Sequence, residues 1–336
     1  MRGRSVGVLY NTDMGEQAQV SRPTLGDVEQ ILATLAQEGY IADREIATAI
    51  YLSIELHKPL LVEGAAGVGK TEIAKVMARA LGTDLIRLQC YEGLDVNTAL
   101  YEWNYQKQML RIRLEEGSGR SPEEKEQTIF SEPFLLRRPL LQAITHPKAP
   151  VLLVDEIDRV DEEFEAFLLE LLSDWQITIP EIGTIRAKHV PYVVLTSNRT
   201  RELSDALRRR CLYLWIDYPS FEKELAIVLR KVPGISRQLA EQIAAFLHAV
   251  RALDLQKVPG VAETLDWSAA LMRLHRDHLD REAVERTLGC LFKHHEDQKV
   301  ARGPWLDRAL AVIADAQRDG QSLQAALDRL ERLARG

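Results

Sequence analysis

The stretch "LLVEGAAGVGKTEIAKVMARAL" constrains the fold of this chain more than any other part of the sequence. Residues 64–71 match the pattern G-x-x-x-x-G-K-[ST], with an apolar run before it and a helical pattern after it. Glycines allow a turn so tight that successive backbone N–H groups and the N-terminus of the following helix point at one place, where phosphate oxygens can bind. A glycine-rich turn without a ligand is the alternative, and the strand, lysine, threonine and helix together count against it.

Two side chains of this phosphate loop have expected roles in binding a nucleotide. We expect Lys70 to reach the β- and γ-phosphates and the hydroxyl of Thr71 to bind Mg²⁺. The expected nucleotide-binding residues are Gly64, Ala65, Ala66, Gly67, Val68, Gly69, Lys70 and Thr71.

The segment "APVLLVDEIDRV" is an apolar run that ends in two acids. Asp155 lies where a carboxylate binds Mg²⁺, directly or through water, and Glu156 lies where a carboxylate polarises an attacking water. Acids often lie at strand ends, so the pair is weak evidence by itself and strong evidence beside a phosphate loop. Glu156 favours hydrolysis of the nucleotide over binding alone.

The strand pattern "YVVLTSN" ends in Asn198, whose amide could orient the attacking water and sense the γ-phosphate. The alternative is a turn-forming asparagine after a strand. The functional interpretation depends on the other motifs, because an asparagine at a strand end is common.

The segment "SDALRRRC" places three arginines at the end of a short helical pattern, with Ser204 suited to the N-cap. Cations at a helix C-terminus complement the helix dipole, which is worth about 0.3–1 kcal/mol. One arginine would meet that need. A run of three leaves room for one with a further role and for others that pair with acids.

The pattern of apolar runs divides the chain into regions. From residue 24 to 219, short apolar runs alternate with helical patterns, which predicts an α/β domain with a mainly parallel sheet. Residues 220–336 carry helical patterns, so an all-helical region follows. Residues 1–23 are polar and aperiodic, which predicts a loose arm. Residues 91–149 exceed a usual crossover in length and predict an insertion.

Charge and cysteine usage limit the classes of partner. A net charge of −7 over 336 residues gives no general attraction to nucleic acid or to anionic membranes, so we expect neither as a partner. The cysteines are few, far apart and without a CxxC pair, which is typical of a reducing compartment. No apolar run approaches the ~18 residues of a membrane span, and the N-terminus lacks a signal-peptide pattern. We therefore expect a cytoplasmic protein.

The phosphate loop, acid pair, strand-end asparagine and arginine cluster, in this order, resemble the AAA+ ATPases from residue 24 to about residue 300. The stretches "LIRLQCYEGLDVNTALYEWNYQKQML", "EPFLLRRPLLQAI" and "GVAETLDWSAALMRL" resemble the MoxR family, in its branch similar to the carbon monoxide dehydrogenase maturation ATPase. This resemblance implies an AAA+ αβα core with a parallel sheet, an all-helical lid, and ATP and Mg²⁺ as ligands.

The resemblance also implies a homo-oligomeric ring, expected to be a hexamer, in which an arginine finger reaches the nucleotide of the neighbouring subunit. By its position before the next strand, Arg210 is the first candidate for this finger and Arg209 is the second. The choice among residues 208–210 stays open. The implied function is ATP-driven remodelling or maturation of a client, a metalloenzyme, with a partner that carries a von Willebrand factor A domain.

The resemblance implies two inserted elements, and at one position the sequence departs from the family pattern. The family places one insertion in residues 91–149 and a hairpin at residues 175–187, both facing the ring pore or partners. Where many AAA+ proteins carry a lid arginine, this chain has Glu263 and Thr264, so no residue is assigned to that role.

Two alternative functions remain open from the sequence. One is a scaffold that binds ATP with negligible turnover, against which the acid pair and the arginines count. The other is a nucleic-acid motor, for which "YEWNYQKQMLRIR" is the candidate segment because its aromatic residues stand near cations.

Overall fold

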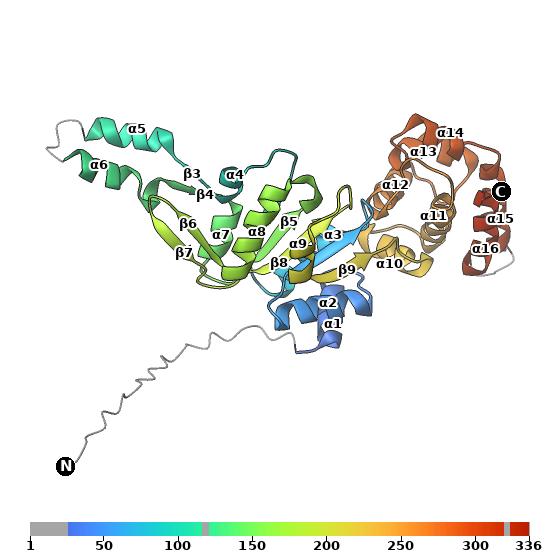
Figure 1. The fold of residues 1–336 in the computed structure, drawn as a ribbon. Helices are drawn as coiled ribbons and strands as arrows, with labels where there is room; N and C mark the ends of the chain where they lie inside the picture. The colour runs from blue at the N-terminus through green and yellow to red at the C-terminus, as the bar shows by residue number, and fades with distance from the viewer. Residues whose placement is uncertain (1–25, 116–120, 319–322, 336) are drawn as a thin grey trace, which may run out of the picture.

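The computed structural model describes residues 26–115, 121–318 and 323–335 (Figure 1). The arm expected over residues 1–23 lies outside the described residues. Figure 1 shows an α/β region that contains the sheet and, beside it, a helical C-terminal region.

The central sheet has five parallel strands in the order β2-β5-β8-β1-β9. The strands are β1 (Leu60–Gly64), β2 (Leu85–Gln89), β5 (Val151–Asp155), β8 (Tyr192–Ser197) and β9 (Leu212–Ile216). Because all five run the same way, their carboxyl ends lie at one edge of the sheet, and this edge carries the phosphate loop, the acid pair and Asn198.

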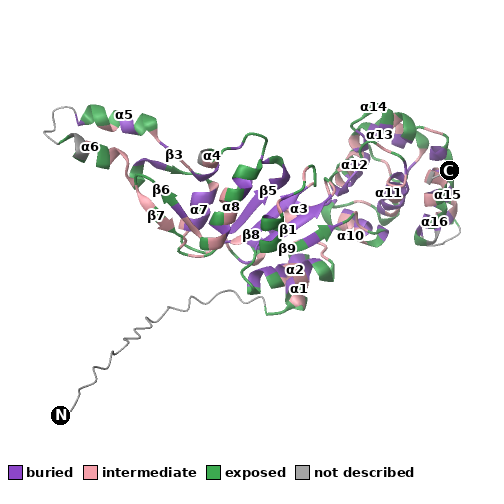
Figure 2. Ribbon diagram, viewed as in Figure 1, coloured by how far each residue is buried: buried purple, intermediate pink, exposed green. Residues whose placement is uncertain are grey.

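Helices cover both faces of this sheet, as the alternation of side chains along β1 requires. Leu60 and Val62 pack against α1, α2 and α3, whereas Leu61 packs on the opposite face against α7, α8 and α9. These helices are α1 (Val28–Gln37), α2 (Arg44–Glu55), α3 (Lys70–Ala80), α7 (Pro139–Thr145), α8 (Glu162–Asp174) and α9 (Asp205–Arg210). The result is a three-layer core in which the central strands β1, β5 and β8 are buried on both faces, whereas the edge strand β9 leaves Tyr213 and Trp215 exposed (Figure 2).

Two small antiparallel elements are inserted into this core. The first contains α4 (Val96–Leu100), β3 (Tyr101–Trp103), α5 (Tyr105–Leu114), α6 (Pro122–Ile129), the 3-10 turn η1 (Glu132–Phe134) and β4 (Leu135–Arg137). β3 pairs with β4, and α5 and α6 project away from the sheet (Figure 1). The second is the hairpin of β6 (Gln176–Ile179) and β7 (Gly183–Arg186), which lies within the segment predicted to form one.

The chain continues from β9 into an all-helical region. Its helices are α10 (Phe221–Lys231), α11 (Arg237–Val250), α12 (Val261–Arg273), α13 (Arg281–Leu291), α14 (His295–Ala301), α15 (Trp305–Arg318) and α16 (Leu323–Arg335). They share a separate core around Phe246, Trp267 and Phe292. Of the helices that the structure describes, none is long and apolar enough to span a membrane. The predicted α/β core with a parallel sheet, followed by a helical region, is confirmed.

Candidate nucleotide-binding site

The phosphate loop connects β1 to α3 through glycines that its geometry requires. A Cβ at Gly64 would lie 2.2 Å from the carbonyl oxygen of Ile216 on β9, so a larger residue would push the strands apart. Gly69 is the N-cap of α3 with φ of 99°, a left-handed conformation that favours glycine. The loop therefore ends with the N-terminus of α3 facing its interior, as an anion site requires.

Lys70 lies inside the loop and is held from three directions. Its Nζ donates hydrogen bonds to the carbonyl oxygens of Gly64 (2.8 Å) and Ala65 (2.7 Å) and to Oδ1 of Asn198 (2.7 Å). Burial lowers the pKa of Lys70, although the carboxylates of Asp158, Asp155 and Glu156 act in the opposite direction. The structure thus brings Asn198, from the end of β8, to the phosphate loop.

Asp155 lies buried beside Thr71 at the end of β5. Its Oδ1 accepts hydrogen bonds from the hydroxyls of Thr71 (3.0 Å) and Thr196 (2.5 Å). Hydroxyl and carboxylate oxygens are the donors that Mg²⁺ prefers, so Thr71 and Asp155 fit this ion. Within the described ranges there is no cluster of three or more His, Cys, Asp or Glu suited to a metal. An ion here would therefore take its remaining ligands from water and phosphate oxygens, which is the usual arrangement for Mg²⁺.

Each acid of the pair also forms an ion pair with an arginine that the sequence motifs did not indicate. Arg87 on β2 donates to Oδ2 of Asp155 from Nε (3.1 Å) and from Nη2 (2.5 Å). Arg159 Nε lies 2.6 Å from Oε2 of Glu156, and Glu156 itself has φ of 58°. The strand pairing of β2 with β5 brings Arg87 to Asp155, so no local pattern reveals this contact.

Asp158 positions the strand end that carries Asn198. Its buried Oδ2 accepts hydrogen bonds from the backbone N–H of Asn198 (3.2 Å) and from the N–H (2.8 Å) and hydroxyl (2.7 Å) of Thr200. The sequence interpretation missed this residue. The available signal was a third acid, three positions after Asp155.

Two adjoining cavities surround the loop. The first, of about 300 Å³, is lined by Ala66, Gly67, Gly69, Lys70, Thr71, Glu72, Lys75, Asp155, Glu156, Thr196, Asn198 and Ala262. The second, also of about 300 Å³, is more apolar and includes Tyr40, Ile41, Val68, Ile216, Ile227, Val261 and Leu265. Four residues, Gly67, Gly69, Glu72 and Ala262, line both. A polar cavity continuous with an apolar one suits a ligand with phosphates at one end and a flat ring system at the other.

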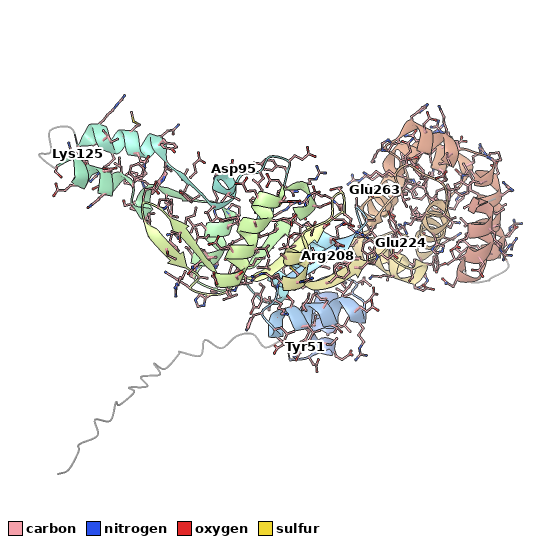
Figure 3. All side chains as sticks on the ribbon, in the orientation of Figure 1. Tyr51, Asp95, Lys125, Arg208, Glu224 and Glu263 are labelled. Atoms are coloured by element: carbon pink, nitrogen blue, oxygen red, sulfur yellow. The ribbon has the colours of Figure 1, made fainter. Side chains whose placement is uncertain are left out.

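The three arginines of α9 lie outside both cavities. Ser204 caps this helix by accepting from the N–H of Leu207 (3.4 Å). Arg208, Arg209 and Arg210 are exposed, and the Arg208 guanidinium lies 5.9 Å from the centre of the Tyr213 ring. Arg208 is labelled in Figure 3. None of the three forms an ion pair with an acid in the part of the chain that the structure describes. The geometry leaves these cations available to another molecule.

The helical region approaches the loop through the first turn of α12. Ala262 lines both cavities, and the Glu263 carboxylate accepts a hydrogen bond from the N–H of Gly260 (3.0 Å). No arginine among the described residues lines either cavity.

Comparisons with known proteins give a family match for part of the chain and distant likenesses to solved structures. Among curated proteins, none matches the sequence significantly. The solved structure of the Thermotoga maritima RuvB Holliday junction branch migration motor is 18% identical, with 83% of this chain and 81% of that chain covered and a TM-score of 0.44. A mutant of the same Thermotoga maritima protein is 18% identical over 78% of this chain and 70% of that chain, with a TM-score of 0.43. Likenesses this distant carry no argument about function. Residues 59–211, which contain the phosphate loop, the acid pair, Asn198 and the three arginines, match the family model of the AAA domain (dynein-related subfamily).

Proposed function

We propose that this protein is a Mg²⁺- and ATP-dependent ring ATPase of the MoxR type that remodels a protein client. The observation that carries the proposal is the convergence of Lys70, Thr71, Asp155, Glu156 and Asn198 on one cavity of about 300 Å³. An AAA domain implies ATP binding. The carboxylate at Glu156 favours hydrolysis over binding alone, because it lies where a base would meet an attacking water.

The side chains of the cavity divide the reaction between them. The N–H groups of the phosphate loop and Lys70 bind the β- and γ-phosphates, while Thr71 and Asp155 hold Mg²⁺, which neutralises phosphate charge when bound. Glu156 accepts a proton from water as the water oxygen attacks the γ-phosphorus, and the amide of Asn198 orients that water. The bond to the ADP oxygen breaks, and ADP and inorganic phosphate are the products. Arg159 must release Glu156 before this carboxylate can act as the base.

A cation from a second subunit completes the site in this proposal. Arg210, or else Arg209, is exposed and lies outside the two cavities at the phosphate loop of its own chain, so it is available to a neighbour's γ-phosphate. A head-to-tail contact of this kind generates a closed ring when the rotation between subunits closes, and we propose a hexamer.

The surface of α5 supports a role in contacting another protein. Five large side chains on this ten-residue helix are exposed to between 39% and 71%: Tyr105, Met109, Leu110, Ile112 and Leu114. The helix belongs to the insertion that projects from the sheet (Figure 2). Exposed apolar patches of this kind mark interaction sites. The partners that we propose follow from the resemblance to the MoxR family: a protein with a von Willebrand factor A domain and a metalloenzyme client. We propose that the protein acts on them in the cytoplasm.

Steady-state ATP hydrolysis over a series of protein concentrations, with particle mass measured with and without ATP, tests the proposal. We expect turnover per chain to rise as rings assemble, because each site needs an arginine from its neighbour. Constant turnover per chain from monomers would contradict the ring. ATP binding by assembled rings without turnover would favour the scaffold, and strong stimulation by DNA would favour the nucleic-acid motor.

A further inference from the structure

The helical region touches the phosphate loop backbone to backbone at Gly260. The N–H of Ala262 donates a hydrogen bond to the carbonyl oxygen of Gly67 (3.3 Å). A Cβ at Gly260 would lie 2.7 Å from the carbonyl oxygen of Ala66 and 2.9 Å from Cα of Gly67, closer than real Cβ atoms approach such atoms. The two segments are therefore in contact with no space for a side chain between them.

A buried cluster holds this segment in place from within the helical region. Glu224, which is fully buried, accepts from both terminal nitrogens of Arg251 at 2.6 Å, and the hydroxyl of Thr264 lies 2.7 Å from Oε1 of Glu224. Arg251 Nε also donates to the carbonyl oxygen of Pro259 (3.1 Å), and the Thr264 hydroxyl lies 3.0 Å from the carbonyl oxygen of Gly260. The cluster thus fixes both residues that precede α12; Figure 3 labels Glu224 in the helical region.

The same helix forms walls of both cavities. Ala262 lines the two cavities together, while Val261 and Leu265 line the apolar one. A Cβ added at Gly67 would lie 3.0 Å from Oε2 of Glu263 and 3.3 Å from Cα of Gly260. A movement of α12 would therefore change the phosphate loop and the apolar cavity at once.

We propose that the helical region responds to the nucleotide through this glycine contact, with Arg251, Glu224 and Thr264 as positioning residues. The inference rests on the proposed nucleotide binding. When phosphates bind, they attract the N–H groups of the loop, and Ala66 and Gly67 move. Because Gly260 is in close contact with both residues, α12 moves with them. The coupling is reciprocal: a change that moves α12 off the loop alters nucleotide affinity by the same factor by which nucleotide shifts α12.

Alanine substitutions at two glycines of the helical region test the proposal. We expect Gly260→Ala to weaken ADP binding about tenfold or more, a coupling of ordinary size, because the added Cβ displaces α12. Gly289→Ala on α13 is the matched control, since its Cβ would meet nothing within 4 Å, and we expect affinity within about twofold of wild type. Titration with a fluorescent ADP analogue measures affinity. Amide hydrogen exchange in α12 with and without ADP measures the response, which we expect Gly260→Ala to lose.

A second pair of variants keeps the proposal testable if Gly260→Ala does not fold, which thermal melting would reveal. Thr264→Val removes the hydroxyl and keeps the shape, whereas Thr264→Ser keeps the hydroxyl. We expect the valine variant to bind ADP about fivefold more weakly and the serine variant to bind like wild type. Wild-type affinity together with an unchanged exchange response in the folded Gly260→Ala protein, or in Thr264→Val, would overturn the inference. Failure of wild type and Gly289→Ala alike to bind ADP would instead show that the proposed function is wrong, and the inference with it.

Discussion

Replacement of Glu156 by glutamine is expected to lower ATP turnover by about 10²–10⁴-fold, the range that a positioned general base contributes. Glutamine has nearly the same size as glutamate, but its amide cannot accept the proton of the attacking water. ATP affinity should persist, because Lys70 and the loop N–H groups do not depend on this carboxylate. Phosphate release and ATP affinity, measured on the same preparation, separate the two effects.

The neighbouring helix offers a matched control for this variant. Glu162→Gln makes the same change at an exposed position in the first turn of α8, outside both cavities. We expect its turnover to equal that of wild type within about twofold, as for most surface substitutions. Turnover near the wild-type value in Glu156→Gln would contradict the assignment of Glu156 as the base.

Replacement of Arg210 by alanine is expected to lower turnover by about 10³–10⁵-fold, the size of the effect of an arginine finger in GTPases. Arg210 lines neither cavity of its own chain, so nucleotide affinity of the isolated chain should stay unchanged. Arg208→Ala is the control on the same helix, since the Arg208 guanidinium lies over Tyr213. An effect of this size from Arg209→Ala instead would transfer the role to Arg209.

Mixing two inactive variants shows whether the arginine acts between subunits. A subunit with Glu156→Gln retains Arg210, and a subunit with Arg210→Ala retains Glu156, so some interfaces of a mixed ring contain both residues. We therefore expect mixed rings to recover turnover that neither variant shows alone. If the mixture assembles into shared rings and stays inactive, the arginine does not act in trans.

The sequence predicts most of the core because its signals are local. Buried parallel strands appear as short apolar runs, and the loop at residues 64–71 needs glycines where strand and helix meet, so both are visible without tertiary information. The length of residues 91–149 predicts an insertion. The helices α5 and α6 within it were not predicted, since α5 leaves its apolar side chains exposed and lacks the stripe typical of a surface helix.

The site residues that sequence analysis missed depend on contacts between distant segments. Arg87 reaches Asp155 through the pairing of two strands, and Gly260 reaches Gly67 through the docking of the helical region on the loop. Neither contact leaves a periodic pattern or a fixed spacing in the sequence. Asp158 is closer to the motif, but its role depends on where the end of β8 lies.

Calorimetric titration of ATP in the presence of Mg²⁺, into wild type and Lys70→Met, shows whether the phosphate loop binds ATP through Lys70. Methionine keeps an unbranched side chain that reaches to the ε position and removes the ammonium group that donates into the loop. We expect one ATP site per chain in wild type, binding weakened about 100-fold or more in Lys70→Met, and wild-type binding in Lys58→Met, an exposed control outside both cavities. Equal ATP affinity in wild type and Lys70→Met, or the absence of binding by wild type, would contradict ATP binding at this loop.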